Sequence, residues 1–136
     1  MPLNRRTLLN LLATSTLAIA AASAWAAQPV VEIIAFDHPP VRSALKPLRD
    51  WLATQGGKLR VVEIDMESAA AAKRLQAVGL TGHIPVVVLV NGRYQYQRKD
   101  GSRVAFVSFP AGAGTPAGVK GSWSAADVQA ALQAGQ

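Results

Sequence analysis

Residues 79–92 read Gly-Leu-Thr-Gly-His-Ile-Pro-Val-Val-Val-Leu-Val-Asn-Gly. The run from Val86 to Val90 is apolar at every position and rich in β-branched side chains, which is typical of a strand buried on both faces. Asn91-Gly92 follows at once, and Asn-Gly is the strongest short signal for a tight hairpin turn. The stretch therefore predicts a central buried strand, after which residues 93–98 return antiparallel to it.

Two pairs of a strand and a helix precede this stretch. The first pair is an apolar strand over 30–36 and a helix whose apolar residues recur at helical spacing over 41–52. The second pair is a strand over 59–65 and an alanine-rich helix over 69–78, with Ser68 as its N-cap. This order of elements predicts two parallel strands joined by a crossover.

Further turns and a strand are predicted beyond the returning strand. Asp100-Gly101 predicts a second hairpin turn, and residues 103–109 form a further strand. Tyr94 and Tyr96 are two positions apart, which places them on one face of the returning strand. Residues 110–121 contain four glycines and two prolines and predict a flexible loop.

The start of a last helix is marked by a capping pair. Ser124 and Asp127, three residues apart, are close to the usual capping box, and Trp123 and Val128 occupy the two staple positions around it. Apolar residues from Val128 to Leu132 provide a small apolar face. The chain is therefore predicted to end in a short helix.

The order of elements and two local motifs resemble the thioredoxin family. Thioredoxins carry Gly-x-x-Gly-Ile-Pro before an apolar strand, and residues 79–85 have this motif with one extra residue, His83. Residues 36–42, Phe-Asp-His-Pro-Pro-Val-Arg, stand in the place of the family's Trp-Cys-Gly-Pro-Cys-Lys turn. The similarity covers residues 31 to about 101 and the last helix.

This resemblance implies an α/β, thioredoxin-like fold with a central mixed sheet of four to five strands flanked by helices. It also implies a cis peptide bond between Ile84 and Pro85, because the family's proline in this position is cis. A cis bond before proline costs only about 0.5–1 kcal/mol. It would turn the backbone of Ile84 toward a groove beside His38.

The reacting groups of the thioredoxin family are missing, because the chain contains no cysteine. His38 and Val41 stand where the family has its two redox cysteines, and neither can exchange a disulfide. The resemblance therefore implies a fold and a groove without thiol-disulfide oxidoreductase activity. We expect a non-enzymatic protein-binding or assembly factor that has no cofactor and binds an exported protein or peptide. The residues expected to contact the partner are Asp37, His38, Pro39, Pro40, His83, Ile84 and Pro85.

A periplasmic metal-binding or metal-delivery protein is the alternative function that the sequence leaves open. His38 and His83 are the two histidines of the chain and are expected at the same end of the sheet, with Asp37 next to one of them. Imidazole ligands suit zinc and copper. A closed structural zinc site takes four ligands, and these residues supply three, so protein binding is the leading expectation.

Residues 1–27 have the three parts of a secretion signal, which are a cationic start at Arg5-Arg6, an apolar stretch and small residues before the cleavage point. Arg5-Arg6 and the leucines after it also resemble a twin-arginine signal, and the general secretory route stays open. The signal predicts a periplasmic or secreted protein without stable membrane insertion after cleavage. Residues 28–136 then form one thioredoxin-like domain, of which 110–121 is the flexible loop.

The charge distribution argues against nucleic acid as a partner. The chain has 14 basic and 8 acidic side chains, and two of the basic ones belong to the signal segment. The remaining excess of four positive charges is spread along the chain without a dense basic run. Nucleic-acid binding needs a clustered basic face, so we expect these charges to form a solvated surface.

Overall fold

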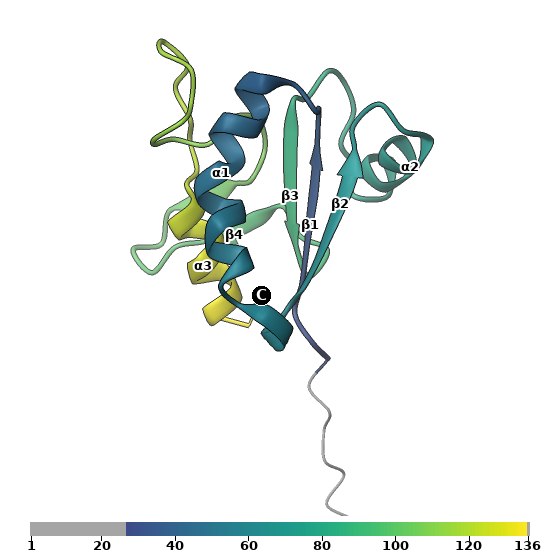
Figure 1. Ribbon diagram of the computed structural model, residues 1–136. Coiled ribbons are helices and arrows are strands. Elements are labelled where there is room, and N and C mark those ends of the chain that lie inside the picture. The colour runs from purple at the N-terminus through teal and green to yellow at the C-terminus, as the bar shows by residue number, and fades with distance from the viewer. Residues whose placement is uncertain (1–26, 136) are drawn as a thin grey trace, which may run out of the picture.

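The computed structural model describes residues 27–135 (Figure 1), so the expected signal segment lies almost entirely outside the described residues. In chain order, the elements are β1 (Val30–Ala35), α1 (Pro39–Ala53), the 3-10 turn η1 (Gly56–Lys58), β2 (Arg60–Asp65), α2 (Ala69–Ala77), β3 (Val86–Val90), β4 (Gln95–Gln97), β5 (Arg103–Ala105) and α3 (Ala125–Gln133). Between residues 27 and 135, no helix has the length and apolar character needed to cross a membrane.

The ends of the helices follow from local sequence signals. α1 begins with Pro39 and Pro40, because the missing N–H of proline leaves no donor unpaired in the first turn. Ser68 caps α2 by accepting a hydrogen bond from the N–H of Ala71. Gly79 follows the end of α2 with a φ of 78°, a conformation that glycine adopts readily. The predicted N-cap of α2 is confirmed, whereas α1 begins two residues before the predicted range of 41–52.

Three strands form the main sheet in the order β2-β1-β3. β1 runs parallel to β2, with Val31 opposite Val61, and antiparallel to β3, with Val31 opposite Val90. The parallel pair confirms the predicted crossover through α1. All five residues of β3 are buried, which confirms a strand covered on both faces.

The chain after β3 departs from the predicted antiparallel return. Asn91-Gly92 forms the expected tight turn, with φ values of 49° and 81° and hydrogen bonds in both directions between Val90 and Arg93. β4 then leaves β3 and pairs with β5 in a separate two-stranded sheet. Phe106 takes the place beside β3, where its C=O accepts a hydrogen bond from the N–H of Val88 at 2.9 Å.

The described residues therefore form a mixed α/β domain with a three-stranded sheet and a two-stranded sheet, and a single central sheet of four to five strands is not confirmed. Tyr96 is buried and stacks on Phe106 at a ring distance of 6.5 Å, whereas Tyr94 packs with the cluster on the opposite face of the main sheet. The expectation that the two tyrosines share a face is wrong, because each ring packs with a different apolar cluster, Tyr96 on the α1 side of the main sheet and Tyr94 on the α2 side.

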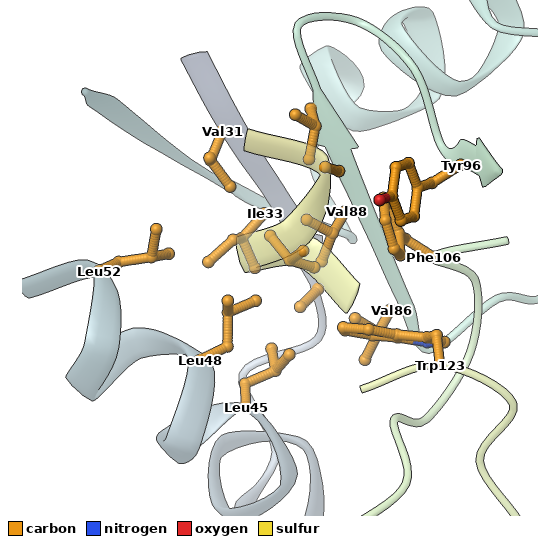
Figure 2. Packing of buried hydrophobic residues seen from close by; sticks show 14 of the residues in the cluster. Val31, Ile33, Leu45, Leu48, Leu52, Val86, Val88, Tyr96, Phe106 and Trp123 are labelled. Carbon is orange, nitrogen blue, oxygen red and sulfur yellow. The ribbon is translucent and has the colours of Figure 1, made fainter. Parts of the chain in front are cut away.

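Apolar side chains cover both faces of the main sheet. On one face lie α1 and α3, and the buried leucines of α1 face Ile33 and Val88 (Figure 2). On the other face, α2 packs Ala71 and Leu75 against Ile34. Figure 1 shows this division, with α1 and α3 on one side of the strands and α2 on the other.

The loop over 110–121 contains no helix or strand, as predicted, but it packs on the domain. The N–H of Ala111 donates a hydrogen bond to the C=O of Trp123 at 2.6 Å. Gly114 lies against the backbone of Ser43 in α1 so closely that a Cβ there would collide with it. The loop therefore packs against α1 and is bonded to Trp123, and its expected flexibility stays a prediction.

Alanine at Gly114 is expected to destabilise the domain more than alanine at Gly118. Both glycines have a positive φ, 89° and 84°, so the backbone strain of an added Cβ is similar. A Cβ at Gly114 also meets the carbonyl of Ser43, whereas one at Gly118 meets nothing within 4 Å. In urea unfolding, we expect losses of about 1–2 kcal/mol for Gly118→Ala and about 2–4 kcal/mol for Gly114→Ala. Equal losses would show that the loop does not rest on α1.

Candidate functional site

Three aromatic rings meet where β1 ends. Phe36 follows β1 directly, His38 is the N-cap of α1, and His83 lies in the segment between α2 and β3. The centroids of the His38 and His83 rings lie 5.2 Å and 5.3 Å from the centroid of the Phe36 ring. The structure therefore brings both histidines to the same end of the sheet, as the sequence predicted, and Phe36 is their shared contact.

The turn that opens α1 is accessible to a partner. Asp37, His38, Pro39 and Pro40 are all exposed, and the His38 side chain makes no capping hydrogen bond. The Asp37 carboxylate forms an ion pair with Arg42 at 2.9 Å. Both side chains are largely exposed, so we expect the pair to contribute at most about 1 kcal/mol to stability.

The peptide bond between Ile84 and Pro85 is trans, because no peptide bond between residues 27 and 135 is cis. The cis expectation is therefore wrong. The C=O of Pro85 accepts a hydrogen bond from the N–H of Phe36 at 3.2 Å, and Ile84 packs half-buried against the cluster under α2. With His83 as an extra residue in the motif, the chain reaches this position with the intrinsically preferred trans bond.

The backbone of residues 81–84 is unpaired. Within residues 27–135, none of its N–H and C=O groups forms a hydrogen bond with the protein. Backbone hydrogen bonding stops just before this segment, where the N–H of Leu80 donates to the C=O of Leu75. It resumes just after the segment, at the C=O of Pro85. Thr81, Gly82 and His83 are exposed, so these groups are accessible to a ligand.

An apolar groove, named here the α2 groove, lies between this segment and α2 and has a volume of about 580 Å³. Its walls are Phe36, Met66, Glu67, Ala72, Leu75, Gln76, Leu80, Thr81, Gly82, His83 and Ile84. Of the partner-contacting residues predicted from sequence, only His83 and Ile84 belong to it. The sequence did not single out Met66 and Leu75. Leu75 has the pattern of an ordinary core residue of α2, and Met66 that of an apolar residue just before this helix. Leu80 offered a signal, since it is apolar although it follows the end of the helix.

The charge of the α2 groove comes from Glu67. No lysine or arginine lines the groove, and Glu67 is in none of the five ion pairs of the described residues. The N–H of Glu67 donates to the carboxylate of Asp65 at 3.0 Å, which places a second acidic side chain nearby. A ligand with a positive charge next to an apolar group would therefore complement this groove.

No family model, no curated protein and no solved structure matches this chain. The similarity to thioredoxins thus rests on the residues at 36–42 and 79–92 and on the order of the elements. Membership of that family stays a prediction.

Within the described residues, the structure places no third ligand beside His38 and His83 that could complete a metal site. Between residues 27 and 135, no group of three or more histidine or acidic side chains is placed to hold a metal ion. Asp37, which the sequence offered as the third ligand, is paired with Arg42. A site made by His38 and His83 stays a prediction that calorimetric titration with Zn²⁺ would test.

Proposed function

We propose that this protein is a non-enzymatic binding factor for an extended polypeptide segment of an exported partner. The backbone of that segment pairs with residues 81–84, and one large apolar side chain of the segment enters the α2 groove. The observation that carries the proposal is a run of four residues with unbonded N–H and C=O groups beside an open apolar groove. Together they supply the main-chain hydrogen bonds and the side-chain pocket that strand addition uses.

A thioredoxin-like fold is part of this proposal. The order β2-β1-β3 is extended at β3 by the hydrogen bonds of Phe106 and Ser108, which is compatible with a short fourth strand. The proposal does not use a cis bond at Pro85. It rests on the unpaired backbone of residues 81–84, which is available to a ligand with the trans bond in place.

A binding role fits the side chains around the groove. The chain has no cysteine, so thiol chemistry is not available at this end of the sheet. His38 and His83 extend the apolar surface of Phe36 with two further rings, and aromatic rings of this kind are favourable contact surfaces. Glu67 favours a lysine or arginine next to the apolar anchor of the partner.

The expected affinity for a short peptide is low. Burial of one large apolar side chain contributes about 1.5–3 kcal/mol, and each main-chain hydrogen bond contributes about 0.5–1.5 kcal/mol net. Part of this gain offsets the loss of translational and rotational freedom. We therefore expect a dissociation constant of roughly 10 μM to 1 mM.

Peptide binding is expected to be blocked by Ala72→Phe and preserved in the matched variant Ala70→Phe. Both alanines are exposed on α2, but only Ala72 lines the α2 groove. The probe is a fluorescein-labelled peptide, Lys-Val-Phe-Val-Lys, whose anisotropy is measured as protein is added. We expect Ala72→Phe to weaken binding by about tenfold or more, while both variants keep the thermal stability of the parent.

NMR spectra of the same titration locate the peptide. We expect the amide signals of residues 81–84 to shift most, because alternate N–H groups of this segment gain hydrogen bonds to the peptide and the others lie beside it. Equal binding by the two variants, or unchanged amide signals at residues 81–84, would contradict the proposed site.

A further inference from the structure

A second cleft, named here the arginine cleft, lies between the end of α2 and β4 and has a volume of about 590 Å³. The residues of its wall that matter for recognition are Val78, Arg93, Tyr94, Gln95, Gln97 and Arg103. Its volume is in the range of ligand-binding pockets. None of these residues belongs to the α2 groove, so the two sites are separate.

The arginine cleft carries positive charge that the protein itself does not neutralise. Within residues 27–135, the side chains of Arg93 and Arg103 make no ion pair and no hydrogen bond, and no carboxylate lines the cleft. Four other arginines of the domain are each bonded to a carboxylate, as Arg74 is to Glu32 at 2.7 Å. Arginine is the side chain best suited to bind an external carboxylate, because its planar fork matches the two oxygens.

One edge of β4 is free along this cleft. β5 is the only strand that pairs with β4 between residues 27 and 135. The C=O of Tyr94 and the N–H of Arg98 are bonded to the β5 side, at 2.7 Å and 2.8 Å. Backbone groups alternate in direction along a strand, so the N–H and C=O groups of Gln95 and Gln97 point to the opposite, unpaired edge.

We propose that the arginine cleft binds an acidic polypeptide segment that adds to the free edge of β4, with two carboxylates paired to Arg93 and Arg103. Arg93 precedes β4, and Arg103 lies opposite Gln97, the last residue of β4, in the β4–β5 ladder, so the two arginines lie near opposite ends of β4. The complementary segment therefore has one acidic residue toward each of its ends.

The free strand edge favours a polypeptide over a nucleic acid as the ligand. A strand edge offers alternating donors and acceptors, which an extended peptide matches with its own N–H and C=O groups. A nucleic acid needs a clustered row of cations for its phosphates, and this cleft has two unpaired arginines.

Binding of an acidic peptide is expected to depend on both arginines of the cleft. The probe is fluorescein-labelled Glu-Val-Thr-Val-Glu, and the control peptide is Gln-Val-Thr-Val-Gln. We expect Arg93→Gln and Arg103→Gln to weaken binding of the probe by about threefold each and the double variant by about tenfold. Arg60→Gln is the matched control, because Arg60 is exposed on β2, makes no ion pair with any residue in 27–135 and does not line the cleft.

Each remaining arm of the experiment supports or overturns the proposal. Ala77→Phe is expected to block the acidic probe, because Ala77 lines the arginine cleft, whereas Ala72→Phe is expected to leave its binding unchanged. N-methylation of the central residues of the probe is expected to abolish binding. The proposal is overturned if the glutamine peptide binds as tightly as the probe, if the double variant binds like Arg60→Gln, if N-methylation has no effect, or if a ten-nucleotide oligothymidylate binds more tightly than the probe.

Discussion

Replacing Trp123 by alanine is expected to lower the free energy of unfolding by about 3–5 kcal/mol, a large part of the total stability of a small domain. Trp123 is fully buried and is the largest side chain of the core. Its ring meets the ring of Phe106 edge-on at a centroid distance of 5.8 Å (Figure 2), and its indole N–H donates to the C=O of Ser108 at 3.0 Å. Alanine leaves a cavity and removes this hydrogen bond.

Replacing Trp123 is also expected to weaken the contact between Ser108 and the main sheet. Ser108 has a φ of 69°, in the left-handed region that is unfavourable for residues other than glycine. Its N–H is bonded to Val86 at 2.7 Å and its C=O to Trp123, and these two bonds hold the strained residue in place. Without Trp123, we therefore expect residues 106–108 to separate more easily from β3.

Trp123→Phe is the control that separates packing from hydrogen bonding. Phenylalanine keeps most of the buried apolar surface but has no N–H, so we expect a loss of about 1–2 kcal/mol. Urea unfolding should be followed by far-ultraviolet circular dichroism, because Trp123 is itself a fluorophore. If alanine costs no more than phenylalanine, the indole does not fill the core as described.

The second large effect is expected at Asp127, in the first turn of α3. Its carboxylate accepts two hydrogen bonds from Arg98, at 2.8 Å and 2.9 Å, and one from the backbone N–H of Ser124 at 2.9 Å. The Asp127 side chain is only 12% exposed. Asp127→Ala removes half of the capping box and leaves Arg98 without its carboxylate, so we expect a loss of about 2–3 kcal/mol.

An exposed ion pair supplies the comparison for Asp127. Asp50 and Lys46 are joined at 2.6 Å on the outer face of α1, and both side chains are mostly exposed. Exposed pairs with this helical spacing contribute little, so Asp50→Ala is expected to cost at most about 0.5 kcal/mol. A similar cost for both alanine variants would show that Arg98 and Ser124 do not hold Asp127 in solution.

The pairing of Asp127 also predicts a dependence of stability on pH. The hydrogen bonds from Arg98 are the largest cause that holds the pKa of Asp127 below its usual value of about 4. A carboxyl with a lowered folded-state pKa stabilises the fold above its unfolded-state pKa, and this contribution is lost as the pH falls through the folded-state pKa. The stability difference between the parent and Asp127→Asn should therefore be constant from neutral pH to about pH 5 and shrink below about pH 4.

Urea unfolding of both proteins at about pH 7, 5 and 3 measures this difference. Asparagine keeps the size of the side chain and cannot ionise between these values, so the difference isolates the charge of Asp127. A difference that stays constant down to about pH 3 would mean that the Asp127 carboxylate is not paired with Arg98.

Sequence reasoning succeeded where neighbouring residues decide the structure. The unbroken apolar run over 86–90 predicted a strand covered on both faces, and it is one. Ser124 and Asp127 form the predicted capping box, with the Asp127 N–H 3.3 Å from the Ser124 hydroxyl. The partners in such signals are at most a few residues apart, so one reading of the chain contains all the interacting groups.

Sequence reasoning failed where two distant segments compete for one place. Residues 93–98 were expected beside β3 because a tight turn precedes them. They are rich in arginine and glutamine, however, and a position next to a fully buried strand favours the apolar residues around Phe106. The cis bond expected at Pro85 failed for a related reason, since the resemblance could not show how the extra residue His83 alters the approach to β3.

The candidate site was predictable only in part. That His38 and His83 lie together followed from the resemblance, because each adjoins the end of a strand predicted in the same sheet. The walls of the α2 groove did not follow, since Met66, Leu75 and Leu80 have no distinguishing pattern in the sequence. Their role depends on how α2 packs against the sheet.

By itself, the sequence determined which chemical groups the protein has and which local elements they form: a chain without thiols, its buried strands, and the capped starts of α2 and α3. Only the tertiary structure decided which backbone and side-chain groups are left without partners, including the N–H and C=O groups of residues 81–84 and the guanidinium groups of Arg93 and Arg103. The physical reason is that hydrogen bonds and ion pairs join groups close in space, such as Arg74 and Glu32, which are 42 residues apart in the chain. A group is known to be free for a ligand only when every segment that could reach it has been placed.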